Sequence, residues 1–459
     1  MRKDRTSVLE KKKGVCVNLK FFTCMPLKKN QRYEVTVPGS KSITNRALLL
    51  GALSSGRTVL KGVLFSDDSR VFMQALKEIG FFVDIQEEEK TVIIEGMGGE
   101  IPGDGTKERT VYVGSAGTAA RFLTAMLALS GGRFLVESSE QMRARPMKPL
   151  LLALEELGTE FEYLKEPYAF PFRILERRSR ESSRSPKKSP MIDLNIDQSS
   201  QFLSALLLSG VMCHKGLAIR LTGTRSAKAY VNISMKMMAE FGCEVEQIEE
   251  DTYRVLPGQQ YQAREYQVEP DVSAACYFYA IAAVTESEVK VKHVHSSTTQ
   301  GDIHFLKILQ KMGCQQREEE DGIVVAGAPL KGIHVDMGDF SDQTMTLAAI
   351  APFAEGDTVI DGVGHIRGQE SDRIRGIVTE LGRMGIQCEE QQDGLTIHPG
   401  EVRPTVVQTY EDHRMAMAFA VTGCRAAGIV IDDPGCCRKT FENYFEVLTS
   451  LNLTSNIKE

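Results

Sequence analysis

The chain has 459 residues, of which 42% are hydrophobic and 25% are charged, and its formal net charge is −6. This composition is ordinary for a soluble globular protein, and the length predicts two or three domains. The lack of a basic excess argues against nucleic acid as the main partner, although local basic clusters could still bind small anions.

The N-terminal segment is basic, but its apolar region is short and is interrupted by Asn18 and Lys20, which argues against a secretory signal. We also expect no membrane span, because no stretch of roughly 18 apolar residues lacks polar interruptions. The ten cysteines include no C-x-x-C pair, and several lie within apolar segments, as in a reducing compartment. We therefore expect a cytoplasmic protein in which residues 1–16 form a loose tail.

Six segments of the chain begin with polar or Ser-rich residues and continue as runs of small apolar side chains. Such runs predict helices that are buried on all sides. The segments recur at intervals of 70 to 84 residues, which indicates an internal repeat. In chain order they begin at Gly39, Gly114, Gln198, Pro270, Ser341 and Glu411.

A second, amphipathic helix is predicted in every repeat, because apolar residues recur at spacings of three and four. Glycine closes most of these helices at the position typical of a helix end. Short β-rich runs lie between the helices. We therefore expect six copies of a unit with strands, one buried helix and one surface helix. The second helices begin near Ser69, Met147, Tyr230, Ile303, Asp372 and Phe441.

Six units exceed one hydrophobic core, so we divide them three and three, with the junction near Glu269 and Pro270. This predicts one domain over residues 40–268. A short strand at residues 33–37 precedes the first unit and can pair with the second half, in which case residues 1–39 join 269–459 as the other domain. The chain would then cross between the halves twice. Residues 177–189 contain no large apolar side chain and are predicted to be a disordered loop.

The starts of the buried helices carry polar side chains that need a physical reason. A helix N-terminus presents unpaired N–H groups and partial positive charge, which suits either a capping side chain or an anion. Capping accounts for Ser115, Ser273 and Ser341.

Capping does not account for the cations at or near the same helix starts. A buried cation at the positive end of a helix is costly unless an anion neutralises it. A salt bridge to Asp or Glu would explain each cation singly. Their recurrence in different units instead favours a site for several anionic groups. The cations are Lys41, Arg46, Arg121, Arg145, Arg373, Arg414 and Lys439.

Other catalytic motifs do not fit the chain. The "GSKS" stretch is not a phosphate-binding P-loop, because Val35 and Ser40 stand where that motif needs glycine. No H-E-x-x-H motif or zinc-ligand cluster occurs, so we expect no metal. His413 is the one histidine in a polar helix start.

Several segments together resemble 5-enolpyruvylshikimate-3-phosphate synthase, in order over roughly residues 33 to 449. They are "VPGSKSITNRALLL", "GSAGTAARFL", "RPMKPLL", "SSQFLSALL", "EPDVSAACYF", "SDQTMTLAAIAPFA", "QESDRI", "EDHRMAMAF" and "RKTFENYFE". The resemblance implies an α/β fold, the two-domain inside-out α/β barrel with three βαβαββ units in each domain. This agrees with the six repeats.

The resemblance also implies a reaction. The enolpyruvyl group of phosphoenolpyruvate passes to the 5-hydroxyl of shikimate 3-phosphate, and phosphate is released, as a step of the shikimate pathway to aromatic amino acids. The expected partners are these two small molecules, with no nucleic acid, membrane, metal or cofactor, and we expect a monomer. The two crossings between the halves would let the domains close on ligand and exclude water.

The chemistry needs an acid, a base and fixed cations. By resemblance, Asp342 is the base near the 5-hydroxyl, and Glu370 is the acid and base at the methylene carbon of phosphoenolpyruvate. Lys41 is a second candidate for proton transfer, and His413 lies beside the leaving phosphate. The simpler interpretations are a helix cap for Asp342 and a surface carboxylate paired with Arg373 for Glu370.

The remaining site residues also follow from the resemblance. Phosphoenolpyruvate would be held by Lys41, Gly117, Arg145, Gln201, Arg373, Arg414 and Lys439, with Gly117 letting the ligand approach the backbone. Shikimate 3-phosphate would be held by Lys41, Ser42, Arg46, Ser199, Ser200, Gln201, Tyr230, Asp342 and Gln369.

The chain departs from the family pattern at four positions. Ser115 and His365 stand where the family often has Asn. Gln369 replaces a usual Lys, and Ala227 replaces a usual Ser, and both changes weaken the expected grip on the shikimate phosphate. Compensating contacts could come from Arg225, Ser226 or Lys228.

Two alternatives stay open. UDP-N-acetylglucosamine enolpyruvyl transferase shares the fold and the donor, but we would expect its reactive Cys in a Gly-rich loop of the first domain and an Asn-rich opening motif. The chain has neither. A non-catalytic anion-binding paralogue is the other alternative, and the retention of Lys41, Asp342, Glu370, Arg414 and Lys439 argues against it.

Overall fold

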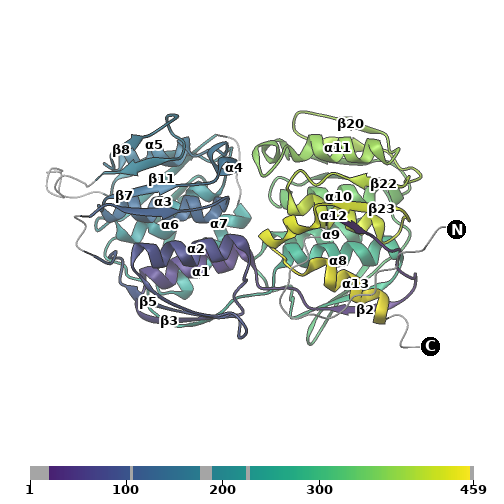
Figure 1. Ribbon diagram of the computed structural model, residues 1–459, viewed down its shortest axis with the longest axis horizontal. Helices are drawn as coiled ribbons and strands as arrows, with labels where there is room; N and C mark the ends of the chain where they lie inside the picture. The colour runs from purple at the N-terminus through teal and green to yellow at the C-terminus, as the bar shows by residue number, and fades with distance from the viewer. Residues whose placement is uncertain (1–19, 104–106, 176–188, 224–227, 455–459) are drawn as a thin grey trace.

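The computed structural model describes residues 20–103, 107–175, 189–223 and 228–454. Two halves lie side by side, joined by two chain segments (Figure 1). Each half has its own hydrophobic core. One core is built from residues between Ile43 and Val268, and the other from residues between Val272 and Leu451 together with a group near the N-terminus that includes Tyr33. The predicted tail, and the predicted loop at 177–189 except Ser189, lie outside the described residues.

Three helices form the centre of each half, and the three pack against one another. Nearly all of their side chains are buried, because these sequences are apolar on every face. This confirms the predicted buried helices. They are α1 (Lys41–Leu53), α3 (Gly117–Ser130) and α6 (Gln201–Ser209) in the first half, and α8 (Val272–Thr285), α10 (Thr344–Ile350) and α12 (His413–Gly423) in the second.

A second helix accompanies each central helix, as predicted, and buries only one face where its burial is described. A short extra helix, α4 (Glu140–Arg143), precedes α5. None of the helices in the described ranges is both long and apolar enough to span a bilayer. The second helices are α2 (Asp67–Ile79), α5 (Lys148–Glu156), α7 (Lys228–Glu240), α9 (Phe305–Lys311), α11 (Arg373–Arg383) and α13 (Tyr444–Thr454).

Six small mixed sheets lie outside the central helices, so the fold is the inside-out α/β arrangement expected from the sequence (Figure 1). In the first half the sheet orders are β14 (Glu265–Gln267)–β3 (Ser55–Lys61)–β5 (Thr91–Met97)–β4 (Phe82–Gln86), β6 (Arg109–Tyr112)–β7 (Phe134–Glu137)–β9 (Phe172–Ile174)–β8 (Phe161–Tyr163), and β10 (Met191–Asn195)–β11 (Leu217–Thr222)–β13 (Thr252–Val255)–β12 (Val245–Glu249). In the second half they are β16 (Gln315–Glu319)–β17 (Gly322–Ala326)–β15 (Glu288–Lys292)–β2 (Arg32–Val35), β18 (His334–Asp336)–β19 (Thr358–Asp361)–β21 (Leu395–Ile397)–β20 (Cys388–Glu390), and β1 (Phe21–Thr23)–β23 (Ile429–Asp432)–β22 (Thr405–Val407).

The halves exchange their first strands. Strand β2 leads directly into α1 of the first half, yet it pairs in parallel with β15 of the second half. Strand β14 leads into α8 of the second half, yet it pairs in parallel with β3 of the first. Each half is therefore completed by a strand whose chain continues into the other half, and the chain crosses between them twice.

The sixth unit differs from the prediction of six equal copies. After β22, α12, β23 and α13 no further strand is described, so the unit lacks the final strand pair of the others. Strand β1, which the sequence patterns did not indicate, pairs antiparallel with β23 instead. In the other units the strand at this place comes from the end of the same unit.

The two crossing segments run against each other. The N–H of Ser40 donates to the carbonyl of Glu269 over 2.8 Å, and the N–H of Asp271 donates to the carbonyl of Pro38 over 2.8 Å. Gly39 sits in this contact, where an added Cβ would collide with the carbonyl oxygen of Gly62. The crossing is therefore compact backbone packing with no room for a side chain at Gly39.

A second close approach between the halves lies at Gly301, and it provides a test of closure. A Cβ added at Gly301 would lie 2.5 Å from the Cβ of Ala229, in α7 of the other half. We expect Gly301→Ala to push the halves apart, at a cost of about 1–3 kcal/mol, and to raise the radius of gyration measured by small-angle X-ray scattering. The double variant Gly301→Ala with Ala229→Gly removes the collision and should restore the wild-type radius. If the wild type and both variants scatter identically, the contact between Gly301 and Ala229 does not set the distance between the halves.

Candidate active site

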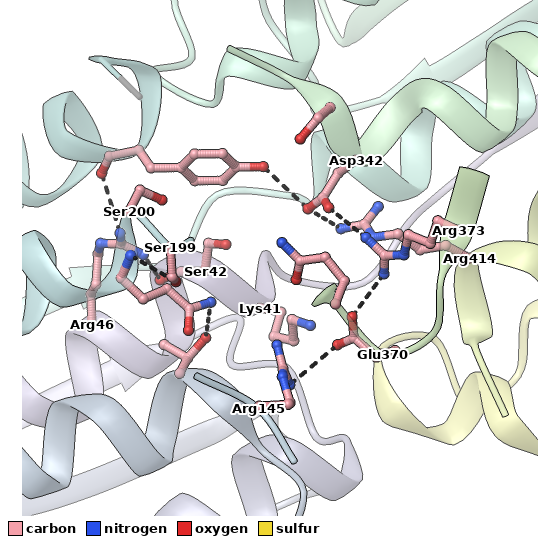
Figure 2. A pocket seen from close by; sticks show the side chains of 15 residues that line it. Lys41, Ser42, Arg46, Arg145, Ser199, Ser200, Asp342, Glu370, Arg373 and Arg414 are labelled. Carbon is pink, nitrogen blue, oxygen red and sulfur yellow. Dashed lines mark hydrogen bonds and ion pairs between the residues drawn. The ribbon is translucent and has the colours of Figure 1, made fainter. Parts of the chain in front are cut away.

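A pocket opens between the two halves (Figure 2). It encloses about 690 Å³ of space, part of it open to solvent. The first half contributes Lys41, Ser42, Arg46, Thr118, Arg145, Ser199, Ser200, Gln201 and Tyr230, and the second half contributes Ser341, Asp342, Gln369, Glu370, Arg373 and Arg414. Side chains from the starts of all the central helices except α8 thus converge on one space.

Most predicted site residues line this pocket. Gly117, His413 and Lys439 do not line it, but Gly117 abuts Arg145, Lys439 Nζ is 3.2 Å from Glu370, and His413 directly precedes Arg414. The sequence interpretation missed Thr118, which lines the pocket, and assigned Ser341 only a capping role. The available signal for Thr118 was its place in the first turn of α3, where polar groups can join the unpaired N–H groups in binding a ligand. Ala227, Arg225 and Ser226 lie outside the described residues.

Asp342 is held by side chains from three elements. Arg414 Nη2 donates to its Oδ2 over 2.7 Å, Arg373 Nη1 to its Oδ1 over 3.1 Å, and Tyr230 Oη to Oδ2 over 3.1 Å. Asp342 caps no helix, because it lies inside the short helix η3 (Ser341–Gln343). Burial alone would raise its pKa, but the charges of Arg414, Arg373 and Lys41 outweigh burial and lower the pKa to about 2.

Glu370 forms the second carboxylate centre of the pocket. Its oxygens lie 2.9 Å from Arg373 Nη2, 3.2 Å from Lys439 Nζ and 3.6 Å from Arg145 Nη1. Figure 2 shows the carboxylate between Arg145 and Arg373. The side chain is 7% exposed, so it is not a surface carboxylate. Burial would raise its pKa, but Lys439, Arg145 and Arg373 together hold the pKa well below its usual range.

Lys41 is the first residue of α1 and lines the pocket. Its Nζ is 3.8 Å from a carboxylate oxygen of Asp68 in α2. Burial lowers the pKa of Lys41, and the charges of Asp68 and Glu370 only partly offset this. Because its pKa is lowered, Lys41 can release a proton more readily than an exposed lysine.

Arg46 differs from the cations near Asp342 and Glu370. Among the described residues, its hydrogen-bond partners are the Ser204 and Ser234 hydroxyls and the carbonyls of Ser42 and Tyr230. Burial lowers its pKa to about 10. A buried guanidinium with neutral partners is the arrangement that an incoming anion would stabilise most.

Gln201, which lines the pocket, connects Arg121 and Thr118. Arg121 Nη1 donates to Gln201 Oε1 over 2.6 Å, and Gln201 Nε2 donates to Thr118 Oγ1 over 3.2 Å. Gly117 has a packing role besides its predicted one, because an added Cβ would lie 2.7 Å from Arg145 Nη1. The glycine thus makes room for the Arg145 guanidinium.

The start of α12 is capped by Asp412, which accepts a hydrogen bond from the N–H of Arg414 over 2.9 Å. The next residue, His413, is 1% exposed, and neither of its ring nitrogens has a hydrogen-bond partner among the described residues. Burial lowers the pKa of His413 well below its usual value, and the charge of Lys41 lowers it further. The imidazole is therefore neutral at pH 7.

The capping prediction for three serines was wrong. The caps of α3, η3 and α8 are Ala116, Phe340 and Asp271. Ser273 instead donates to Asp302, and Ser341 Oγ lies 2.7 Å from His365 Nε2. The salt-bridge interpretation holds for five of the cations, each within 4 Å of a carboxylate: Lys41, Arg145, Arg373, Arg414 and Lys439. No metal-binding group of three or more His, Cys, Asp or Glu side chains occurs in the described ranges.

Fold and site define a class: a two-domain inside-out α/β protein with a cationic pocket between its halves. The family model of EPSP synthase (3-phosphoshikimate 1-carboxyvinyltransferase) matches residues 27–448. The chain belongs to this family of enolpyruvyl transferases, which act in the shikimate pathway of chorismate and aromatic amino acid biosynthesis.

Individual relatives agree with the family model. A 3-phosphoshikimate 1-carboxyvinyltransferase of Trichormus variabilis is 43% identical over 412 residues, which are 90% of this chain and 94% of the relative. A second, from Halalkalibacterium halodurans, is 38% identical over 441 residues, 95% of each chain. The solved structure of EPSP synthase from Acinetobacter baumannii superposes with a TM-score of 0.77 at 25% identity, covering 94% of this chain and 98% of that one.

Proposed function

We propose that the protein transfers the enolpyruvyl group of phosphoenolpyruvate to the 5-hydroxyl of shikimate 3-phosphate in the pocket between its halves. The observation that supports this most directly is the pair of carboxylates, Asp342 and Glu370, each held by largely buried cations in a pocket that both halves line. Both substrates carry a phosphate and a carboxylate, so they need several cations. The reaction also moves protons, so it needs carboxylates or amines.

In this proposal Lys41 delivers a proton to the methylene carbon of phosphoenolpyruvate, or Glu370 does so once the bound anion draws on Lys439, Arg145 and Arg373 and raises the pKa of that carboxylate. The neighbouring carbon becomes cationic in character, and the 5-hydroxyl oxygen bonds to it while Asp342 takes the hydroxyl proton. The bond between this carbon and the phosphate oxygen then breaks, and phosphate leaves beside His413. The methyl group returns its proton to the residue that donated it. The proton that Asp342 takes from the 5-hydroxyl goes to the departing phosphate, so the protons balance over the cycle.

Asp342 becomes a stronger base when substrate binds. In the free protein Arg373 and Arg414 hold its pKa at about 2, since both guanidinium groups donate to it. Anionic groups of phosphoenolpyruvate would draw on the same two arginines and weaken their hold on Asp342. The pKa of the carboxylate then rises, as proton abstraction requires.

The two ligands would occupy different sides of the pocket. Phosphoenolpyruvate would contact Lys41, Gly117, Arg145, Gln201, Arg373, Arg414 and Lys439. Shikimate 3-phosphate would contact Lys41, Ser42, Arg46, Ser199, Ser200, Gln201, Tyr230, Asp342 and Gln369. Figure 2 supports this division, with Ser42, Arg46, Ser199 and Ser200 on one side and Glu370, Arg373 and Arg414 on the other. A cytoplasmic location and a monomeric state remain parts of the proposal.

Phosphate release from phosphoenolpyruvate tests the function directly. We expect release only when shikimate 3-phosphate is also present, and a sharp fall in the Asp342→Ala variant. Release with UDP-N-acetylglucosamine in place of shikimate 3-phosphate would assign the protein to the alternative transferase. No release with either acceptor would favour a non-catalytic anion-binding protein.

Gln369 gives a test of acceptor recognition. It lines the pocket where the family usually has Lys. We expect Gln369→Lys to lower KM for shikimate 3-phosphate by about tenfold or more, because a charge-assisted hydrogen bond contributes about 1.5–3 kcal/mol. KM for phosphoenolpyruvate should change much less. Gln369→Met, similar in size but without the hydrogen-bonding amide of Gln, is the control and should raise KM for the acceptor. A lysine variant that binds the acceptor no better would show that other residues hold its phosphate.

A further inference from the structure

Asp302 is a buried carboxylate just outside the pocket. It lies in the short helix η2 (Gly301–His304) of the second half, and only 6% of its surface is exposed. It does not line the pocket. None of the sequence patterns singled it out. Its position is unusual because it makes no hydrogen bond to a cation among the described residues, and an ionised carboxylate buried without one is costly.

The side chain of Asp302 reaches Asp342 through one residue. Gln343 Nε2 donates to Asp302 Oδ2 over 3.1 Å, and Gln343 directly follows Asp342 in η3. The Gln343 amide is held in this orientation, because its Oε1 accepts from Thr346 Oγ1 over 2.9 Å. Asp302 therefore holds the backbone that presents Asp342 to the pocket.

The same segment is tied to the crossing between the halves. Ser273, in the first turn of α8, donates its hydroxyl to Asp302 Oδ2. The neighbouring Gln300 accepts from the N–H of Val272 over 3.2 Å and donates to the carbonyl of Pro270 over 2.8 Å. The crossing and the loop that carries Asp342 thus share Asp302 as a common anchor.

Two charged residues that line the pocket, Asp342 and Arg414, also act on the Asp302 carboxylate. Burial, and after it the charge of Asp342, raise its pKa to about 6, against the opposing charge of Arg414 and the hydrogen bonds from Ser273 and Gln343. On the α8 side the titratable neighbours of Asp302 are Cys276 and Asp271. Burial, Asp302 and Asp271 raise the pKa of the Cys276 thiol. Above pH 6, an ionised Asp302 attracts Arg414, which also pairs with Asp342.

We propose that Asp302 is a positioning residue for Asp342: it fixes η3 through Gln343, and its negative charge draws on Arg414 so that Asp342 stays basic enough to accept a proton. This inference rests on the proposed function, in which Asp342 takes the hydroxyl proton. Asp302 itself touches neither substrate.

The Asp302→Asn variant tests the charge, because the amide oxygen can still accept from Ser273 and Gln343. We expect kcat to fall by about 10- to 100-fold, the loss typical when the partner of a functional group is removed. KM for phosphoenolpyruvate should change much less than kcat, because Arg414 keeps its direct partner Asp342. In the wild type kcat should fall as the pH drops through about 6, where Asp302 gains a proton. The variant, neutral at every pH, should lack this step. An unchanged kcat with the step retained would overturn the proposal.

Two further variants separate charge from hydrogen bonding. Ser273→Ala keeps the charge and the link to η3, so it should keep a near wild-type kcat and the pH step. Gln343→Met keeps the charge but breaks the link, so kcat should fall while the step remains. If Gln343→Met instead has the wild-type kcat, Asp302 does not act through η3 and the proposal fails in that part.

Unfolding stability tests the proposal without depending on catalytic turnover. The pKa of Asp302 is about 6 in the folded protein and about 4 for an unfolded Asp. The folded state therefore binds the extra proton between these values, so the wild type should lose stability relative to Asp302→Asn as the pH rises from about 4 to about 6. Above that window the difference should stay constant. Urea unfolding of both proteins across this range measures it. A pH-independent difference would overturn the proposal, whereas failure of the wild type to turn over would instead refute the proposed function.

Discussion

Replacing Asp342 by Asn is expected to lower kcat for enolpyruvyl transfer by about 10²- to 10⁴-fold, the range that a general base contributes. The amide keeps the size of the carboxylate and can still accept one hydrogen bond. It cannot take the hydroxyl proton. Steady-state kinetics with phosphoenolpyruvate and shikimate 3-phosphate measures the change.

The surrounding contacts make the Asp342 experiment clean. Arg373 keeps Asp412, 2.8 Å away, and Glu370 as partners, so its guanidinium stays paired when the charge of Asp342 is lost. Asp357→Asn is the matched control, because Asp357 is an exposed carboxylate of the same half that pairs with His398. It should keep the wild-type kcat. A folded Asp342→Asn variant with nearly full kcat would move the base to another residue, and Lys41 would be the next to replace.

Replacing Glu370 by Gln should have opposite effects on donor binding and on turnover. Glu370 neutralises Lys439, Arg145 and Arg373 in the free protein. Without its charge these cations attract an anion more strongly. We expect the dissociation constant of phosphoenolpyruvate to fall by about tenfold, equal to roughly 1.4 kcal/mol. We expect kcat to fall by about 10²-fold or more, because a proton-transfer group is lost.

Isothermal titration calorimetry and single-turnover kinetics measure these two effects separately. Glu380→Gln is the matched control, because Glu380 is a fully buried carboxylate of the same half that pairs with Arg383, away from the pocket. It should lose stability without gaining affinity for phosphoenolpyruvate. Weaker donor binding in Glu370→Gln would mean that the carboxylate orders the cations more than it competes with the ligand.

The sequence allowed prediction of the central and outer helices because each has a strong local signal. A run of small apolar residues such as that in α8 can only be buried on every face, and the three- and four-residue spacing of α2 marks a one-sided helix. The repeat itself then predicted the number of units. The short β1, three residues long, carries no such pattern, because its pairing with β23 is decided by tertiary structure.

Most of the residues that line the pocket were predicted, but which of them pair with one another was not. The cations stood out because buried positive charge at helix starts needs an anion. Which carboxylate meets which cation depends on how the halves are placed, so the pairing of Arg414 with Asp342, 72 residues apart, has no local signal. The same holds for Ser273, which bonds Asp302 across 29 residues rather than capping its own helix. The sequence did not single out Asp302, because one Asp in a polar stretch carries no pattern that predicts its burial.

The strand exchange has a consequence for the order in which the protein is made on the ribosome. Strand β2 emerges early, but its partner β15 lies 256 residues later, as the contact between Gln31 and Ser287 shows. At about 5–20 residues per second, the wait is roughly 13 to 50 seconds. The half spanning residues 40–268 can meanwhile complete all its sheets, since β14 ends at Gln267. Strands β1 and β2 thus stay unpaired while that half forms, β1 until β23 is made, and as exposed edges they need protection from wrong partners.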